Sequence, residues 1–245
     1  MEWRDSFLDL ALIPLSLLLP MAYHVWLWRA VRLHPLRTAA GINSAVRRLW
    51  AIGMMKDNDK QAVTVVQSLR NVIMGSTLMA TTAILFCTGI AAVLSSTYTI
   101  KKPLSDTVFG AHGEYMMALK YVALLLIFLF AFLCHSLAIC FLNQASFLMN
   151  TSAALLSGGH LGLPDTRDYI AEILERGFTL NFVGNRLFYA GVPLLLWIFG
   201  PLLAFLSSMV MIPILYNLDI VNVKADTGCI NGKSAEMNGN DCMHV

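Results

Sequence analysis

The chain has 245 residues, of which 57% are hydrophobic and only 13% are charged. Soluble domains carry about 25% charged residues, so this composition excludes an ordinary soluble domain and indicates an integral membrane protein. The net charge of +2 decides nothing by itself, because membrane proteins arrange charge by side of the bilayer. The lack of a long basic cluster with interleaved aromatic residues argues against a nucleic-acid partner.

Four segments each offer the roughly 20 apolar residues that are needed to cross a hydrocarbon core of about 30 Å. They cover residues 7–28, 72–93, 121–142 and 187–215. We therefore expect an all-α fold with four transmembrane helices in one domain, residues 1–219. The polar composition of residues 220–245 predicts a disordered tail.

Basic residues are distributed unevenly between the connecting segments. The first connection, 29–71, is rich in arginine and lysine, whereas the one after the second span has only Lys101 and Lys102. By the positive-inside rule, connections 29–71 and 143–186 are cytoplasmic. Both termini are then expected to be extracellular or lumenal, at the plasma membrane or an endomembrane.

Each cytoplasmic connection contains a short amphipathic element. In the first, Arg47 and Arg48 alternate with apolar residues such as Trp50, and Lys56 follows, a pattern typical of a helix that binds anionic lipid headgroups. Packing beneath the protein's own spans would bury the same apolar face, and the pattern does not separate the two. In the second element, Gly177 is expected to end a short surface helix.

The second span carries the most informative polar pattern. Its hydroxyl residues fall in one narrow stripe at helical spacing, with a basic residue at the water boundary. Such a stripe is typical of a polar path through the membrane, but also of helices that pack closely. The pathway-lining candidates are Arg70, Thr77, Thr81, Thr88 and Ser95, with His135 of the third span.

His135 allows three interpretations. A neutral histidine bonded to another helix is the ordinary one, and a proton-linked role is the second. His24 is expected at a similar depth in the first span, so a haem held by both histidines is a remote third. No phosphate loop, zinc spacing or Ser/His/Asp arrangement is evident, and we expect no enzymatic activity and no cofactor.

These features favour a channel-like or transport protein for ions or small solutes. Four helices with a polar stripe enclose a path more easily by association, so a homo-oligomer is expected. The alternative is a membrane scaffold or signalling component that docks partners through its basic cytoplasmic connection. The fourth span contains Pro193, Gly200, Pro201 and Pro213, which predict a bent or partly unwound helix.

Long strings of the sequence resemble a plant family of four-span membrane proteins of unknown function. They are HPLRTAAGINSAVRRLW, MMKDNDK, QSLRNVIMGSTLMATTAIL, KKPLSDTVFGAHGEY, ALKYVALLLIFLFAFLCHSLAICFLNQ and GFTLNFVGNRLFYAGVPLLLWIFGPL. The resemblance covers roughly residues 7–219 and implies a plant source and a polytopic membrane protein. It implies no activity and no site residues.

Overall fold

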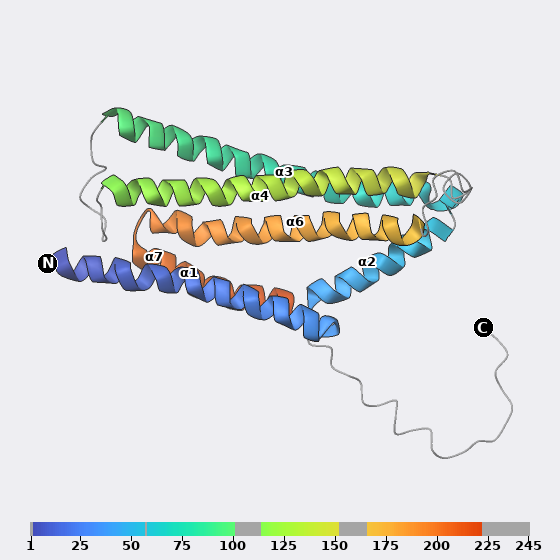
Figure 1. Cartoon of the computed structure of the whole chain (residues 1–245), viewed down its shortest axis with the longest axis horizontal. Coiled ribbons are helices and arrows are strands. Elements are labelled where there is room, and N and C mark those ends of the chain that lie inside the picture. Colours follow the sequence, from blue (N-terminus) through green and yellow to red (C-terminus); the bar gives the residue numbers. More distant parts are fainter. Residues whose placement is uncertain (1, 57, 101–113, 152–165, 222–245) are drawn as a thin grey trace, which may run out of the picture.

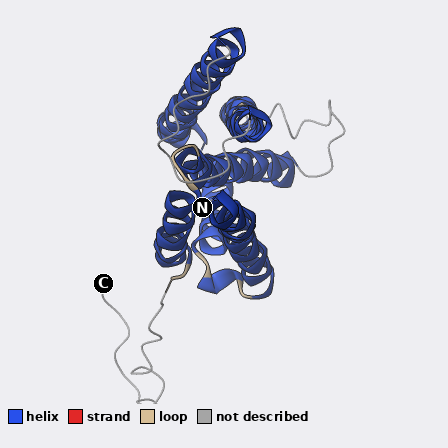
Figure 2. Ribbon diagram, turned by 90° about the vertical axis from the view of Figure 1, so that its left-hand side faces the viewer, coloured by secondary structure: helices blue, strands red, loops and turns tan. Residues whose placement is uncertain are grey.

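The computed structural model describes residues 2–56, 58–100, 114–151 and 166–221. These residues are helical almost throughout (Figure 2), so the predicted all-α class is confirmed. The elements in chain order are α1 (Glu2–Leu33), the 3₁₀ helix η1 (Pro35–Arg37), α2 (Ala39–Lys56), α3 (Asn58–Ile100), α4 (Glu114–Asn150), α6 (Thr166–Trp197) and α7 (Pro201–Asp219).

The long helices form two layers (Figure 1). The three-helix layer has α4 between α3 and α6, and the two-helix layer consists of α1 and α7 running parallel. The Ser208 hydroxyl of α7 donates to the Ser16 carbonyl of α1 at 2.9 Å. Contacts between α6 and α7 connect the layers. We call the end of the molecule at which α2 lies the α2 end.

The α2 end has its own hydrophobic core, to which α2, α3, α4 and α6 all contribute. Its buried residues are Ala51, Met55, Val65, Leu69, Leu142, Ala145, Met149, Ile170, Ile173 and Leu174. α3 has 43 residues, which at about 1.5 Å per residue gives about 65 Å, roughly twice the hydrocarbon thickness. The three-helix layer is therefore long enough to cross a membrane and to pack with α2 outside it.

The contact between α4 and α6 depends on glycines at every seventh residue of α6. A Cβ atom at Gly177 would lie 2.9 Å from Leu142 Cγ, and one at Gly184 or Gly191 would lie 2.8 Å from the His135 or Phe128 ring. Those α4 residues are also seven apart, the repeat of helices that pack along a shared seam. We call Gly177, Gly184 and Gly191 the glycine seam. The prediction that Gly177 ends a short surface helix is wrong, because α6 continues through Gly177 to Trp197.

The predicted fourth span is wrong as a single helix. α6 ends at Trp197 and α7 begins at Pro201, and Gly200 between them has φ 157° and ψ 157°, a conformation that essentially only glycine adopts. Proline begins a helix readily because the first helical N–H needs no intrahelical acceptor. α7 then returns antiparallel to α6 (Figure 1) and brings Asp219 to Arg186.

This hairpin also changes where the described chain ends. Ile220 forms an antiparallel bridge with Thr38, so α7 ends at the α2 end, whereas α1 begins at the opposite end (Figure 1). The expectation that both termini face one side depended on a single helix over 187–215, and this arrangement contradicts that premise. The predicted polar tail lies outside the described residues from position 222 onward.

Within the described ranges, three helices are long and apolar enough to cross a membrane. These are Val63–Ser96 within α3, Met117–Asn150 within α4, and Pro201–Asp219, which is α7. The first two contain the predicted spans 72–93 and 121–142. α1 and α6 are not in this set, and the predicted number of four spans is not confirmed. The helices are those expected of a membrane-embedded protein.

The glycine seam gives a first prediction. Gly177→Ala should destabilise the protein by about 1–3 kcal/mol, because the added methyl overlaps Leu142 and overpacking carries a cost of this size. Gly53→Ala is the matched control, since Gly53 is an exposed helical glycine at the same end with nothing within 4 Å of its Cβ position. It should be neutral or stabilising by up to about 1 kcal/mol. The measurement is thermal unfolding of purified protein in detergent, and equal effects of the two substitutions would contradict the seam.

Candidate functional site

Two groups of buried polar residues meet at α6, one on each side of it. The first lies within the three-helix layer, where the Ser76 hydroxyl of α3 donates to the Asn181 amide oxygen at 2.9 Å. His135 of α4 is 0% exposed, and its ring packs against Gly184. Asn181 lies beside that ring, yet among the described residues neither ring nitrogen has a partner at hydrogen-bonding geometry. We call Ser76, Asn181 and His135 the histidine cluster.

The second group joins the two layers. The Tyr23 hydroxyl of α1 donates to Asp219 Oδ2 at 2.6 Å, and Arg186 Nη2 of α6 forms an ion pair with Asp219 Oδ1. The Arg186 and Asp219 side chains are only 12% and 4% exposed. A carboxylate at the last residue of a helix is disfavoured by the helix dipole, so Arg186 and Tyr23 compensate an otherwise costly position. We call Tyr23, Arg186 and Asp219 the interlayer cluster.

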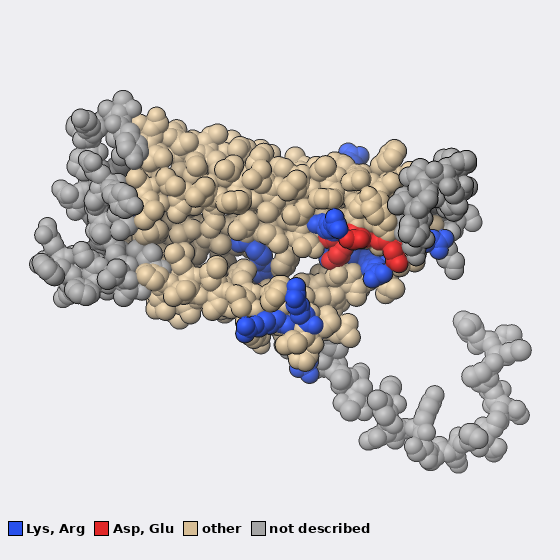
Figure 3. Space-filling view, in the orientation of Figure 1, with Lys and Arg blue, Asp and Glu red and all other residues tan. Residues whose placement is uncertain are grey.

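Arg186 retains bonding capacity beyond this pair. Its guanidinium stacks on Phe182 with the carbon 4.6 Å from the ring centroid, and the buried Nη1 has no partner among the described residues. The space-filling view in Figure 3 shows a hollow between the two layers in which a basic side chain is visible. A buried arginine with a free donor is suited to an anionic group, because guanidinium binds carboxylate and phosphate through several parallel N–H groups.

The hydroxyl stripe of the second span lies elsewhere. Thr77, Thr81 and Thr88 are exposed on α3, and their hydroxyls donate to carbonyls of their own helix, those of Ile73, Thr77 and Leu85, at 2.8–2.9 Å. Arg70 and Ser95 are exposed as well. The stripe therefore faces outward from the single chain and does not meet His135. Ser76, one residue before Thr77, turns inward and is 1% exposed.

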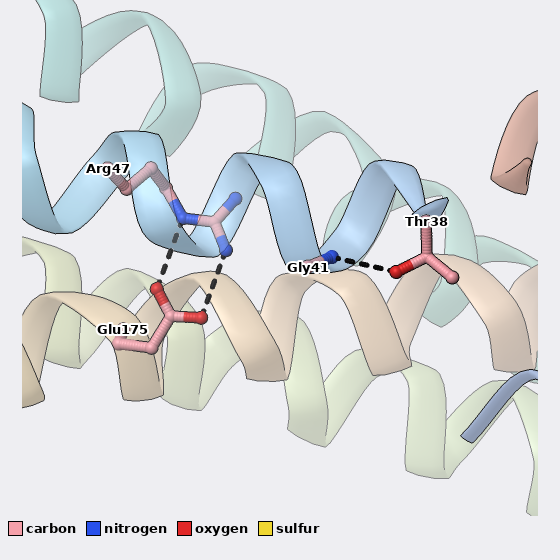
Figure 4. Close-up of polar contacts among 4 residues, drawn as sticks. All are labelled: Thr38, Gly41, Arg47 and Glu175. Atoms are coloured by element: carbon pink, nitrogen blue, oxygen red, sulfur yellow. Dashed lines mark hydrogen bonds and ion pairs between the residues drawn. The ribbon is translucent and has the colours of Figure 1, made fainter. Parts of the chain in front are cut away.

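The basic residues predicted to bind lipid lie on α2, against α6. Arg47 pairs with Glu175 through its Nε at 3.3 Å and its Nη2 at 3.0 Å (Figure 4). Arg48 forms an exposed ion pair with Asp168 at 2.9 Å. Trp50 packs on the core of the α2 end. The apolar face of α2 thus covers the protein's own helices. The Lys56 side chain lies outside the described residues.

The start of α2 is fixed by local contacts. Gly41 donates its N–H to the Thr38 hydroxyl at 3.2 Å (Figure 4), as expected where a threonine caps a helix. A Cβ at Gly41 would lie 2.3 Å from the Pro35 carbonyl oxygen, so only glycine permits this close turn. The cap and the turn set the direction in which α2 leaves α1.

The two histidines of the haem hypothesis belong to different helix contacts. His24 Nδ1 lies 2.7 Å from the Pro20 carbonyl, and its ring packs edge-on against Tyr23. His135 packs between α4 and α6, on Gly184. The rings do not converge on a shared site. Among the described residues, no group of three or more His, Cys, Asp or Glu side chains is arranged to hold a metal ion.

The interlayer cluster was not predicted from the sequence, although one feature of the sequence pointed to Arg186. Arg186 and Asn181 come just before the apolar run that begins at Leu187. Polar residues in or next to a membrane span are functional candidates. Asp219 carried no comparable signal, because nothing in its neighbourhood indicates that α7 returns to Arg186.

The fold and the two clusters define an all-helical membrane-embedded protein with buried polar groups around one helix. The sequence model described as "Protein of unknown function, DUF599" matches residues 11–224, and the chain belongs to this family. No curated protein and no solved structure matches the chain significantly.

The interlayer cluster gives a second prediction. Asp219→Asn should destabilise the protein by about 3–5 kcal/mol, because it leaves the buried Arg186 charge without its partner. Asp168→Asn is the matched control, since the Arg48 and Asp168 side chains are 64% and 56% exposed, and exposed pairs contribute less than about 1 kcal/mol. Thermal unfolding in detergent measures both. A loss for Asp219→Asn no larger than for the control would show that the buried pair does not hold the layers together.

Proposed function

We propose that this protein transports small anionic solutes or ions through a membrane, along a path between the two layers that passes Arg186. The observation that carries the proposal is the buried ion pair between Arg186 and Asp219 at the junction of α1, α6 and α7. Replacing a buried ion pair with apolar residues of similar volume is often neutral or stabilising, so stability alone is a weak reason to keep one. Ionisable residues buried in a membrane protein mark ion pathways and substrate sites, and Asp219 ends α7, which is one of the three candidate spans.

The arrangement suggests how an anion would bind. Arg186 Nη1 has no partner among the described residues, so an incoming anion finds a donor before the ion pair opens. An anion that binds through two parallel N–H groups on different nitrogens would also engage Nη2, which pairs with Asp219, and it would then compete with the carboxylate. Release of Asp219 would also free Tyr23 and loosen α7 from α1 and α6. Anion binding would then be coupled to a change in the contact between the two-helix layer and the three-helix layer.

The outward stripe of α3 supports a homo-oligomer as part of this proposal. Gly75 and Gly89 on α3 have nothing within 4 Å of their Cβ positions, and small and hydroxyl residues together favour close contacts between membrane helices. The stripe is then a surface for association rather than the lining of the path. By the positive-inside rule we place the α2 end in the cytoplasm.

The transport proposal predicts which substitutions abolish flux. In liposomes, the double variant Arg186→Gln, Asp219→Asn should lose anion flux at least about tenfold, equivalent to about 1.4 kcal/mol of lost interaction. It removes both charges together, so no buried charge is left unpaired and folding is preserved better than in either single variant. Thr81→Val, Thr88→Val is the matched control on the outward stripe and should conduct like the wild type.

The control also separates the competing functions. Flux that falls in the threonine variant but not in the Arg186 variant would place the path on α3 and overturn the route along α6. A folded wild type that passes no common anion or cation would overturn transport and favour the membrane scaffold or signalling role. All variants are compared at equal oligomer size and unfolding temperature.

A further inference from the structure

The arginines of the structure fall into two groups that differ in how their charge is balanced. Arg47, Arg48, Arg176 and Arg186 each form an ion pair with an acidic side chain. By contrast, five described arginines are exposed and have no acidic partner among the described residues: Arg29, Arg32, Arg37, Arg70 and Arg167. The first three lie close together in the chain, at the end of α1 and in η1. On the face shown in Figure 3, the acidic side chains gather beside basic ones over α2 and α6, whereas basic side chains gather without acidic neighbours near the end of α1.

The three unpaired arginines at the end of α1 and in η1 are interleaved with large exposed apolar side chains. Trp28, Leu33 and Leu36 are 55%, 72% and 70% exposed, and the Arg32 guanidinium carbon lies 4.0 Å above the centre of the Trp28 ring. Tryptophan and arginine occur together at membrane–water boundaries, where the ring meets the acyl region and the cation meets headgroups. We call these three arginines, with Trp28, Leu33 and Leu36, the basic corner.

The position of the corner along the molecule agrees with such a boundary. α7 qualifies as a membrane span and ends at Asp219. Immediately afterwards Ile220 bridges to Thr38, and the Val221 N–H donates to the Arg37 carbonyl at 3.2 Å. Arg37 therefore lies at the level where this span ends, which is where lipid headgroups are found.

We propose that the basic corner binds the anionic headgroups of the leaflet at the α2 end. The arginines of α2 are already neutralised by Glu175 and Asp168, so the surface that attracts anionic lipid is the end of α1 with η1 rather than α2. Because the charges are exposed, the attraction weakens as ionic strength rises. This binding is independent of the proposed transport, and its test does not use flux.

The test titrates the full-length protein in detergent with short-chain phosphatidylserine, and separately with short-chain phosphatidylcholine and inorganic phosphate, and follows the unfolding temperature. Wild type should be stabilised by phosphatidylserine in a salt-sensitive way and by neither of the other two. Arg29→Gln, Arg32→Gln, Arg37→Gln should weaken phosphatidylserine binding by about fivefold for each arginine removed. The matched control is Arg48→Gln, Arg176→Gln, which removes exposed arginines that are paired and should bind like the wild type.

Lysine variants keep the experiment decisive if the glutamine variant folds poorly. Arg29→Lys, Arg32→Lys, Arg37→Lys preserves the charge and should retain the response. The proposal is overturned if the corner variant responds as the wild type does, or if the control loses as much as the corner variant. A response to inorganic phosphate equal to that for phosphatidylserine would also overturn it, by showing a simple anion site in place of a lipid surface.

Discussion

The close contact between α4 and α6 is the constraint on which the rest of the structure depends. Glycines at 177, 184 and 191 let the α6 backbone approach Leu142, His135 and Phe128 so closely that a methyl group would overlap each of them. In a membrane, where lipid competes with any apolar side chain, such small residues allow the dense packing that holds helices together. The seam also extends to the α2 end, where Leu142 belongs to the core shared with α2, so one repeat aligns both regions.

Because α6 is held on one side by the seam, its other residues meet fixed partners. Asn181 reaches Ser76 within the three-helix layer, whereas Arg186 reaches Asp219 in the two-helix layer. These polar contacts lie close together along α6. A shift of α6 along the seam would therefore displace both clusters together. In this way α6 couples the two layers.

Composition and apolar run length predicted the all-helical class and the membrane segments of α3 and α4, because those properties are local. The reversal at Gly200 was not predictable in this way. A Gly-Pro pair in an apolar run is compatible with a bend or a hairpin, and only contacts between residues distant in sequence, such as Arg186 with Asp219, decide between them. The direction in which the hydroxyl stripe faces was not predictable for a related reason. α3 carries polar residues on more than one face, and Ser76 and Thr77 differ by about 100° around the helix axis, so spacing alone could not show which hydroxyl turns inward.

Charge balance connects the surface of the protein with its interior. Two ion pairs join α2 to α6: the exposed Arg48–Asp168 pair and the half-buried Arg47–Glu175 pair. Each contributes little to the free energy of unfolding, because water screens the charges. The Arg186–Asp219 pair is different, because its charges are almost fully removed from water and burying either charge without the other would be costly. Loss of one partner would therefore have to be compensated by another charged group. This is why the anion site that we propose lies at the interlayer cluster and not at one of the exposed pairs.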